Sequence, residues 1–301
     1  MPLPLCGHAS VLGLLSRAKD APAGAYGFFG PEHIGKRRVA EVFARELLGC
    51  AEPLPLDSHP DFALLDAQAD ASIEVVRAFL ERTHRTSARG GRRVFLIDHA
   101  ESLNASGFNA LLKDVEEPRP GVTFLFVAAQ PEALPATLRS RIVPLALREV
   151  PQEELRSWAE THLHVDASWV AEAVGRPGLL VRRVDSPDWW MVYQRHAQQF
   201  LEAYTKPDPG ALIAALDDWQ KAIENAEHPE STWRLLLLLL AKRMNAEPEL
   251  FQQRASFAEA MVIAWRANGG PLPTRIAFEW KRLEGEVAAH DHAALLREWG
   301  K

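Results

Sequence analysis

The stretch that decides the fold is GAYGFFGPEHIGKR, residues 24–37. Residues 24–29 form a short apolar run that ends at Gly30, which predicts a buried strand. Over residues 37–48, apolar side chains recur at spacings of three and four, which predicts an amphipathic helix. Between them, residues 30–36 match the phosphate-binding pattern G-x-x-x-x-G-K. A strand before the pattern and a helix after it favour a true phosphate-binding loop.

Each residue type in this loop has a physical role. Gly30 and Gly35 let backbone N–H groups close around phosphate oxygens, and Lys36 reaches the outer phosphates. The next residue is normally Ser or Thr, whose hydroxyl holds a magnesium ion, but Arg37 places a cation there. We therefore expect magnesium to bind poorly. Two interpretations remain open: weak binding of ATP or ADP, or a vestigial loop that keeps only the strand-to-helix turn.

A second element of the same chemistry follows a buried apolar run at residues 94–97. Asp98 stands at the end of this run, where an acidic residue of a P-loop protein reaches the magnesium ion. The alternative is that Asp98 caps the following turn. A catalytic Glu is expected at the next position, and His99 offers no negative charge there.

Strands and helices alternate through the first half of the chain. Further strands are predicted at residues 62–65, 94–97 and 122–129, helices at 73–83 and 106–116, and residues 137–143 complete the domain. This alternation predicts an α/β fold, a parallel sheet flanked by helices. Beyond it the periodicity is helical only. We predict a P-loop domain over residues 1–148, a small helical lid over 149–186 and an all-helical domain over 187–301.

Composition narrows the classes of function. The 301 residues are 47% hydrophobic and 25% charged, which suits two or three packed domains. A net charge of -6 disfavours a protein that binds nucleic acid by itself. Only two cysteines are present, so no four-thiolate zinc site is expected, and a reducing compartment fits. The longest apolar run, residues 235–241, is too short to cross a membrane, and we expect a cytoplasmic location.

Four segments together carry a specific likeness: GPEHIGKRRVAEVFARELL, SHPDF, RRVFLIDHAESLNASGFNALLKDVEEP and TFLFVAAQPEALPATLRSR. They resemble the AAA+ subunits of the bacterial DNA polymerase III clamp loader, over about the first 180 residues. The likeness is strongest to the delta-prime branch of that family. It implies a AAA+ P-loop domain, a lid, and a C-terminal collar domain for oligomerisation.

The resemblance also implies which functions are lost. Relative to the motor subunits, called gamma or tau, Arg37 replaces the metal-binding hydroxyl and His99 the catalytic carboxylate. Ala129 stands at the sensor-1 threonine and Gly178 at the sensor-2 arginine. We therefore expect no intrinsic ATPase activity. The family's four-cysteine zinc module is also absent after Cys50, so neither zinc nor another cofactor is expected to be required.

One feature of the family that acts on a neighbour is retained. Ser140 and Arg141, in LRSRI, resemble a Ser-Arg-Cys motif whose arginine reaches the ATP site of the adjacent subunit. Arg141 is thus the candidate catalytic residue, an arginine finger acting in trans. The alternative is an ordinary surface salt bridge. Arg139 is a less suitable candidate because it does not follow the serine, and Ile142 replaces the cysteine.

The resemblance implies a subunit of the DNA polymerase III holoenzyme that works in a hetero-oligomeric ring. Its partners would be the motor and delta subunits and, through the complex, the sliding clamp and primed DNA. A rival hypothesis is a working P-loop enzyme, either a motor ATPase or a kinase, since Gly30, Gly35, Lys36 and Asp98 are intact. A scaffold unrelated to replication is a third.

Overall fold

The computed structural model describes residues 3–50, 55–88 and 91–205, together with positions 214, 215, 218 and 221. The chain divides into two units, Met1–Val184 and Asp185–Lys301, and each is considered by itself. Almost all described elements belong to the first unit, which contains every candidate site residue.

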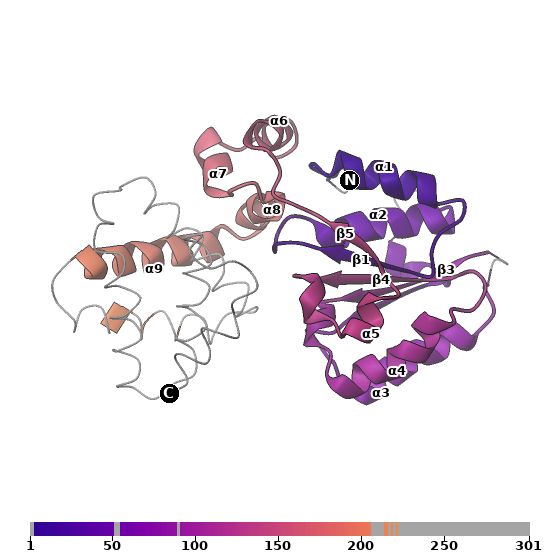
Figure 1. The fold of residues 1–301 in the computed structure, drawn as a ribbon. Coiled ribbons are helices and arrows are strands. Elements are labelled where there is room, and N and C mark those ends of the chain that lie inside the picture. Colours follow the sequence, from indigo (N-terminus) through magenta and orange to yellow (C-terminus); the bar gives the residue numbers. More distant parts are fainter. Residues whose placement is uncertain are drawn as a thin grey trace. The chain divides into compact units, whose positions relative to one another are not determined.

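A five-stranded parallel sheet is the centre of the first unit (Figure 1). Its strands are β1 (Ala25–Phe29), β2 (Phe62–Asp66), β3 (Arg93–Asp98), β4 (Val122–Ala128) and β5 (Val143–Ala146). They lie in the order β2-β3-β4-β1-β5, so β1 is paired with β4 on one side and β5 on the other. This order brings the ends of β1, β3 and β4, which are distant in sequence, to one edge of the sheet. The expected parallel sheet is confirmed.

Helices cover both faces of this sheet. Figure 1 shows α1 (Ala9–Ala18) and α2 (Lys36–Leu48) on one face, and α3 (Ile73–Glu81), α4 (Ala105–Glu116) and α5 (Ala136–Arg139) on the other. Short 3-10 turns connect the elements at Leu56–Ser58, Arg82–His84, Ala100–Ser102 and Pro131–Ala133. The flanking helices predicted from periodicity at residues 37–48, 73–83 and 106–116 are therefore present.

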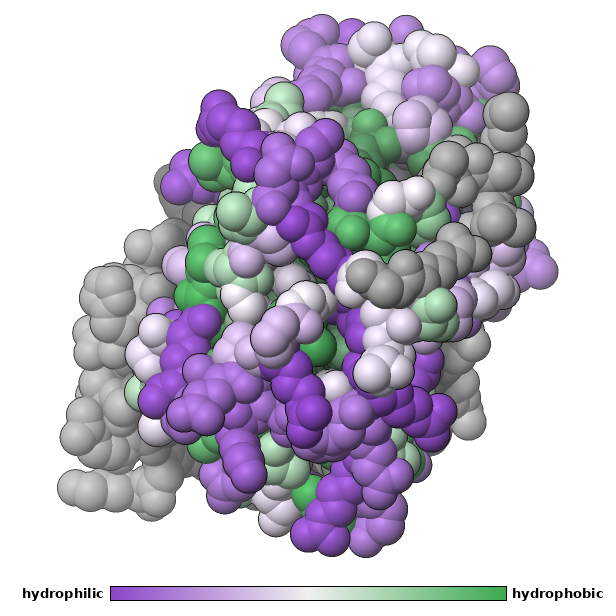
Figure 2. Space-filling view, turned by 90° about the vertical axis from the view of Figure 1, so that its right-hand side faces the viewer, coloured by the Kyte–Doolittle hydropathy of each residue, from purple (hydrophilic) through white to green (hydrophobic). Residues whose placement is uncertain are grey.

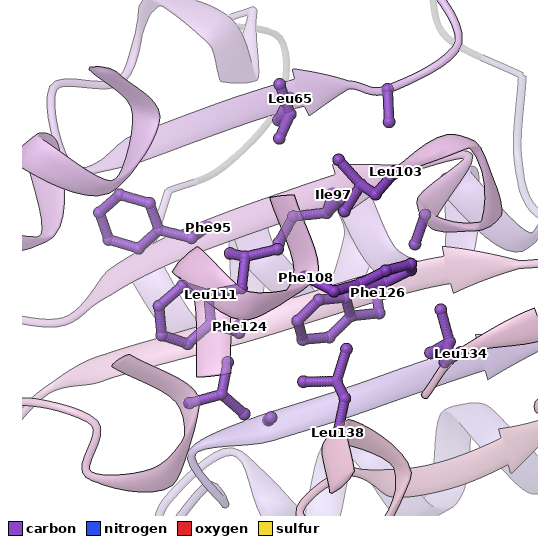
Figure 3. Close-up of a cluster of buried hydrophobic side chains, with 14 of the residues drawn as sticks. Leu65, Phe95, Ile97, Leu103, Phe108, Leu111, Phe124, Phe126, Leu134 and Leu138 are labelled. Atoms are coloured by element: carbon purple, nitrogen blue, oxygen red, sulfur yellow. The ribbon is translucent and has the colours of Figure 1, made fainter. Parts of the chain in front are cut away.

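Burial on both faces explains why the strands show no polar alternation. In β3, Val94 and Leu96 join the apolar cluster under α1 and α2, whereas Phe95 and Ile97 join the one under α3 and α4. Successive side chains of a strand point to opposite faces of the sheet. A strand whose two faces are both covered by helices is therefore apolar throughout. Figure 3 shows the second cluster, where Phe124 of β4 lies beside Phe95 of β3 and Phe126 is the register partner of Ile97.

Aromatic contacts add specificity to this cluster. The rings of Phe79 and Phe95 meet edge to face, with centroids 5.4 Å apart and planes at 88°. Phe95 and Phe124 lie 5.6 Å apart in a tilted arrangement. Such pairs contribute about 0.5–1.5 kcal/mol each beyond the area they bury. They fix how α3 sits on β3 and β4.

The fifth strand was not predicted from the sequence. Residues 143–146, Val-Pro-Leu-Ala, form β5 at the sheet edge, where only Leu145 is buried. Proline has no N–H for a ladder and is tolerated at an edge. A short, largely exposed edge strand with a proline carries no periodic signal, and this accounts for the omission.

Three helices follow the sheet within the first unit: α6 (Gln152–His162), α7 (Ala167–Glu172) and α8 (Pro177–Asp185). The Val150 N–H donates to the Gly175 carbonyl at 2.8 Å, which joins the segment before α6 to the turn between α7 and α8. Arg183 of α8 bonds Glu172 at 2.5 Å and lies 3.8 Å from the Trp169 ring centroid. α7 ends at Glu172, and Val174 shortly after it adopts a left-handed φ of 49°.

In the second unit, α9 (Pro187–Thr205) is described. The remainder of the expected all-helical domain, 187–301, lies outside the described residues except for four positions, and the two boundaries between the three domains stay predictions. Within the described part of the chain, no helix has the length and apolarity to span a membrane. Figure 2 shows one face on which hydrophilic residues cover most of the coloured surface and apolar ones occur in small groups.

Candidate functional site: the P-loop and the arginine surface

The loop from Gly30 to Gly35 connects β1 to α2 as the motif predicts. Gly30 has φ 150° and Gly35 has φ 94°, both in the region that side chains disfavour. A Cβ on Gly30 would also collide with the carbonyl group of Leu147, which follows β5. Both glycines are therefore required by the backbone, whether or not a phosphate binds.

Lys36 begins α2 and is 9% exposed. Its ammonium donates a hydrogen bond of 2.8 Å to the carbonyl oxygen of Pro31, inside the loop itself. In this structure the lysine thus closes the loop on its own backbone.

Arg37 occupies the position of the metal-binding hydroxyl and lies between two carboxylates. Its Nη1 is 3.2 Å from Oδ2 of Asp98, and its Nε is 2.9 Å from Oε1 of Glu41. Burial by itself lowers the pKa of Arg37, but the hydrogen bonds and charges of Glu41 and Asp98 outweigh it and raise the pKa. The cation is held permanently at the centre of the site.

Asp98 contacts both the start of the following turn and Arg37. Its side chain is 5% exposed, and besides Arg37 it accepts a hydrogen bond of 3.0 Å from the N–H of His99. His99 has a left-handed φ of 49°. The carboxylate therefore caps the following turn and, at the same time, pairs with the Arg37 guanidinium.

The helical group after the sheet contacts this loop directly. The N–H of Gly178, in the first turn of α8, donates to the His33 carbonyl at 2.8 Å. A Cβ on Gly178 would come within 2.8 Å of that oxygen and 3.1 Å of the His33 Cα. Any side chain at this position conflicts with the observed packing, and this includes the sensor-2 arginine that the resemblance places here in the motor subunits.

Sequence reasoning missed three contacts around the loop. His8 Nε2 lies 2.8 Å from the Ile34 carbonyl oxygen, and Glu101 accepts a hydrogen bond of 3.2 Å from the Ala129 N–H. Glu41 could have been found, because it stands four residues after Arg37 on one helix face. His8 and Glu101 have no such local signal.

Arg141 lies apart from this site, after α5 on the opposite face of the sheet from α2 (Figure 1). Its side chain is 38% exposed, with Nη2 2.8 Å from Oε1 of Glu116 and Nη1 2.6 Å from the Thr137 carbonyl. Arg139 forms a longer ion pair, with Nη1 4.0 Å from Oε1 of Glu132. The structure thus brings Gly30, Gly35, Lys36, Arg37 and Asp98 together and leaves Arg141 at a separate surface. Both roles suggested for Arg141, finger and surface ion pair, are compatible with this placement.

Metal ligands were also considered. Among residues 3–50, 55–88 and 91–205, His, Cys, Asp and Glu side chains form no group of three able to hold a metal ion. Cys6 and Cys50 are free thiols.

Comparison with known proteins shows what the N-terminal half of the chain is similar to. Residues 14–151 match the family described as DNA polymerase III, delta subunit. The delta-prime subunit of DNA polymerase III from Pseudomonas aeruginosa is 36% identical over 141 residues, 41% of this chain and 43% of that protein. The tau subunit from Escherichia coli is 31% identical over 150 residues, 45% of this chain and 23% of that protein. The match thus spans less than half the length of these relatives.

Two solved structures from Thermotoga maritima are similar to the chain. A DNA polymerase III gamma subunit-related protein has a TM-score of 0.46 at 16% identity, over 90% of this chain and 99% of that one. The RuvB Holliday junction branch migration motor has a TM-score of 0.47 at 17% identity, over 98% and 88%.

The matched residues 14–151 contain the loop, Asp98 and the Ser140-Arg141 pair, on a parallel sheet flanked by helices. Over residues 14–151, the chain is therefore similar to the subunits of the DNA polymerase III clamp loader.

Proposed function

We propose that the chain is a delta-prime-type subunit of the clamp loader, which does not hydrolyse ATP itself and supplies Arg141 to a neighbouring motor subunit. The sequence match to a delta-prime subunit supports the branch. The observation that carries the proposal is the ion pair between Arg37 and Asp98.

This ion pair leaves no place for magnesium. In P-loop NTPases the Ser or Thr hydroxyl and the Asp at the end of the neighbouring strand hold the ion together. Here the first group is a guanidinium and the second is bonded to it at 3.2 Å. A divalent cation would have to displace Arg37 from a buried carboxylate and then sit beside a positive charge. The residues present do not fit the metal, so we assign no metal-dependent step to this chain.

Three further positions support loss of hydrolysis. His99 lacks the negative charge that polarises an attacking water. Ala129 has no side-chain oxygen for a sensor role, and its N–H is bonded to Glu101. At Gly178 the backbone lies against His33, where an arginine would not fit.

Arg141 supplies the positive function in this proposal. Its guanidinium is at the surface, where a neighbouring subunit can approach it. A guanidinium delivered in trans stabilises the charge that develops on transferring phosphoryl oxygens, and is worth roughly 10³–10⁵ in rate in other NTPases. The chain would thus activate a site that it does not contain.

The remaining parts of the proposal rest on the likeness to this family. The partners are the motor and delta subunits, and through the complex the sliding clamp and primed DNA, in the cytoplasm. The chain needs neither zinc nor another cofactor, and nucleotide binds at the loop weakly or not at all.

Nucleotide binding to the isolated chain tests this proposal. With ATP, we expect a dissociation constant in the millimolar range or no binding, unchanged by magnesium, measured by calorimetry or by the shift in melting temperature. Tight binding that requires magnesium and is lost in Lys36→Ala would contradict it.

An active motor ATPase is the alternative, and two observations favour it. Tau subunits match the chain at 31% identity. The motif residues Gly30, Gly35, Lys36 and Asp98 are all present. Steady-state ATP turnover by the purified chain separates the two functions. Turnover abolished by Lys36→Ala supports the motor. An inactive chain that raises ATPase activity of a reconstituted complex only when Arg141 is intact supports the delta-prime role.

A further inference from the structure

Arg141 is held by its own subunit through three acceptors. Nη2 contacts Oε1 of Glu116 at 2.8 Å, and Nη1 donates to the Thr137 carbonyl at 2.6 Å and to the Ser140 hydroxyl oxygen at 3.2 Å. The Ser140 hydroxyl itself donates to the Thr137 carbonyl at 3.0 Å. The guanidinium is therefore anchored by the last residue of α4 and by α5 with its capping serine.

These contacts leave part of the guanidinium free. Arginine carries five N–H donors in a planar fork. Both hydrogen bonds start from Nη1, the ion pair with Glu116 lies at Nη2, and no described residue accepts a hydrogen bond from Nε. An oxyanion can thus be bound without breaking any of the three contacts.

We propose that Glu116 is a positioning residue for Arg141, which orders the guanidinium at the subunit surface so that its remaining N–H groups, Nε–H among them, are presented to the neighbour's phosphates. This inference rests on the proposed function. An exposed arginine samples many rotamers, and ordering it during the reaction costs free energy. A carboxylate that orders it beforehand removes part of that cost.

The position of Glu116 argues against a role in stability alone. It is the last residue of α4, where the helix dipole disfavours a negative charge. Both side chains of the pair are largely solvated, with exposures of 38% for Arg141 and 43% for Glu116. Exposed pairs contribute little to folding. Loss of Glu116 should therefore leave the free energy of unfolding nearly unchanged.

The chain provides a matched control close by. Arg139 is as exposed as Arg141, at 37%, and also pairs with a glutamate, Glu132, but the distance is 4.0 Å and Glu132 is 70% exposed. The Arg139–Glu132 pair thus has the same charges and lies close to Arg141 in the chain, but its longer distance does not hold the arginine in place.

The experiment measures ATPase activity of a clamp loader reconstituted from the full-length chain and its sister subunits, with sliding clamp and primed DNA. Arg141→Ala is measured first, and we expect a loss of about 10³-fold or more at the site it serves. Glu116→Ala should lower kcat about two- to fivefold, the range for an exposed ion pair, with KM for ATP unchanged. Glu116→Gln should recover part of the loss, because its amide oxygen still accepts a hydrogen bond. Glu132→Ala should have no effect.

Two further measurements separate positioning from folding. The melting temperature of the isolated Glu116→Ala chain and its assembly into the complex, followed by gel filtration, should match the unsubstituted protein. Combined with Arg141→Ala, Glu116→Ala should cause no additional loss, since it acts only through that side chain.

The outcomes are distinguishable. If Arg141→Ala leaves activity unchanged, the proposed function fails and the positioning role fails with it. If Arg141→Ala is inactive but Glu116→Ala is unchanged, more active, or no different from Glu132→Ala, the proposed function stands and the positioning role is wrong.

Discussion

At the residue scale, the decisive feature is one guanidinium between two carboxylates. Arg37 is half-buried, bonded to Asp98 and Glu41, and its pKa is raised. A permanent internal cation satisfies Asp98 electrostatically, so the charge balance that magnesium gives to a working P-loop is achieved without metal. In the proposed function, Arg37 thus removes the metal site while the fold of the loop is kept.

Replacing Arg37 by threonine tests this. Arg37→Thr restores the hydroxyl and releases Asp98, and we expect magnesium-dependent binding of ATP to appear, at least tenfold tighter than in the unsubstituted chain. Calorimetry with and without magnesium measures it. Arg37→Lys is the control, because it keeps the charge and should gain nothing. Equal binding by both variants would show that the cation is not what excludes the metal.

At the element scale, α8 is fitted to the P-loop through a glycine. Gly178 donates its N–H to His33, and the space for a side chain is filled by the His33 backbone. Backbone atoms cannot move aside as a flexible side chain does, so the contact constrains both elements. Gly13, inside α1, is a glycine of the opposite kind, with nothing within 4 Å of its missing Cβ.

These two glycines give a paired prediction. Gly178→Ala should lower the free energy of unfolding by about 1–3 kcal/mol, through overpacking against the loop. Gly13→Ala should raise it by up to ~1 kcal/mol, because alanine is the better helix former and meets no obstacle. Chemical denaturation of both variants measures the difference. Equal effects would mean that α8 is not packed on the loop in solution.

At the scale of the first unit as a whole, the N-terminal segment ties distant parts together. The Leu3 carbonyl accepts from Arg38 at 3.3 Å, the Pro4 carbonyl from the Trp158 indole at 3.1 Å, and His8 bonds the loop at Ile34. Cys6 lies within this segment and is 5% exposed. Its reactivity therefore reports whether α2, α6 and the loop separate.

Burial, with a smaller contribution from Glu154, raises the pKa of Cys6 to about 12. The folded state holds the thiol proton more tightly than the unfolded state, so this contribution to stability is complete below the unfolded thiol pKa of about 8.5 and is lost progressively as pH rises toward 12. At pH 8 we expect a thiol reagent to label Cys50, which is partly exposed, while Cys6 reacts only after denaturant is added. Mass spectrometry of the labelled peptides distinguishes the two. Rapid labelling of Cys6 in the native protein would contradict the observed packing.

Much of the fold could be predicted from local patterns in the sequence. Four strands and their helices were predicted because each gives a contiguous apolar run or a three-and-four periodicity, and both follow from burial within one element. The edge strand β5 was missed since only Leu145 of its four residues is buried. The candidate site could be predicted only in part. The motifs predicted Gly30, Gly35, Lys36, Arg37 and Asp98, but they did not predict the residues outside the motifs that contact them.

By itself, the sequence determined the loop, the cation at its metal position and the Ser140-Arg141 pair, because each lies within a few consecutive residues. Only the tertiary structure decided that Arg37 meets Asp98, 61 residues away, that Gly178 lies on His33, and that Arg141 is held by Glu116. The physical reason is the parallel sheet. The strand order is set by packing of the whole domain, and it brings the ends of strands that are distant in sequence to one edge of the sheet. No local periodicity encodes that order.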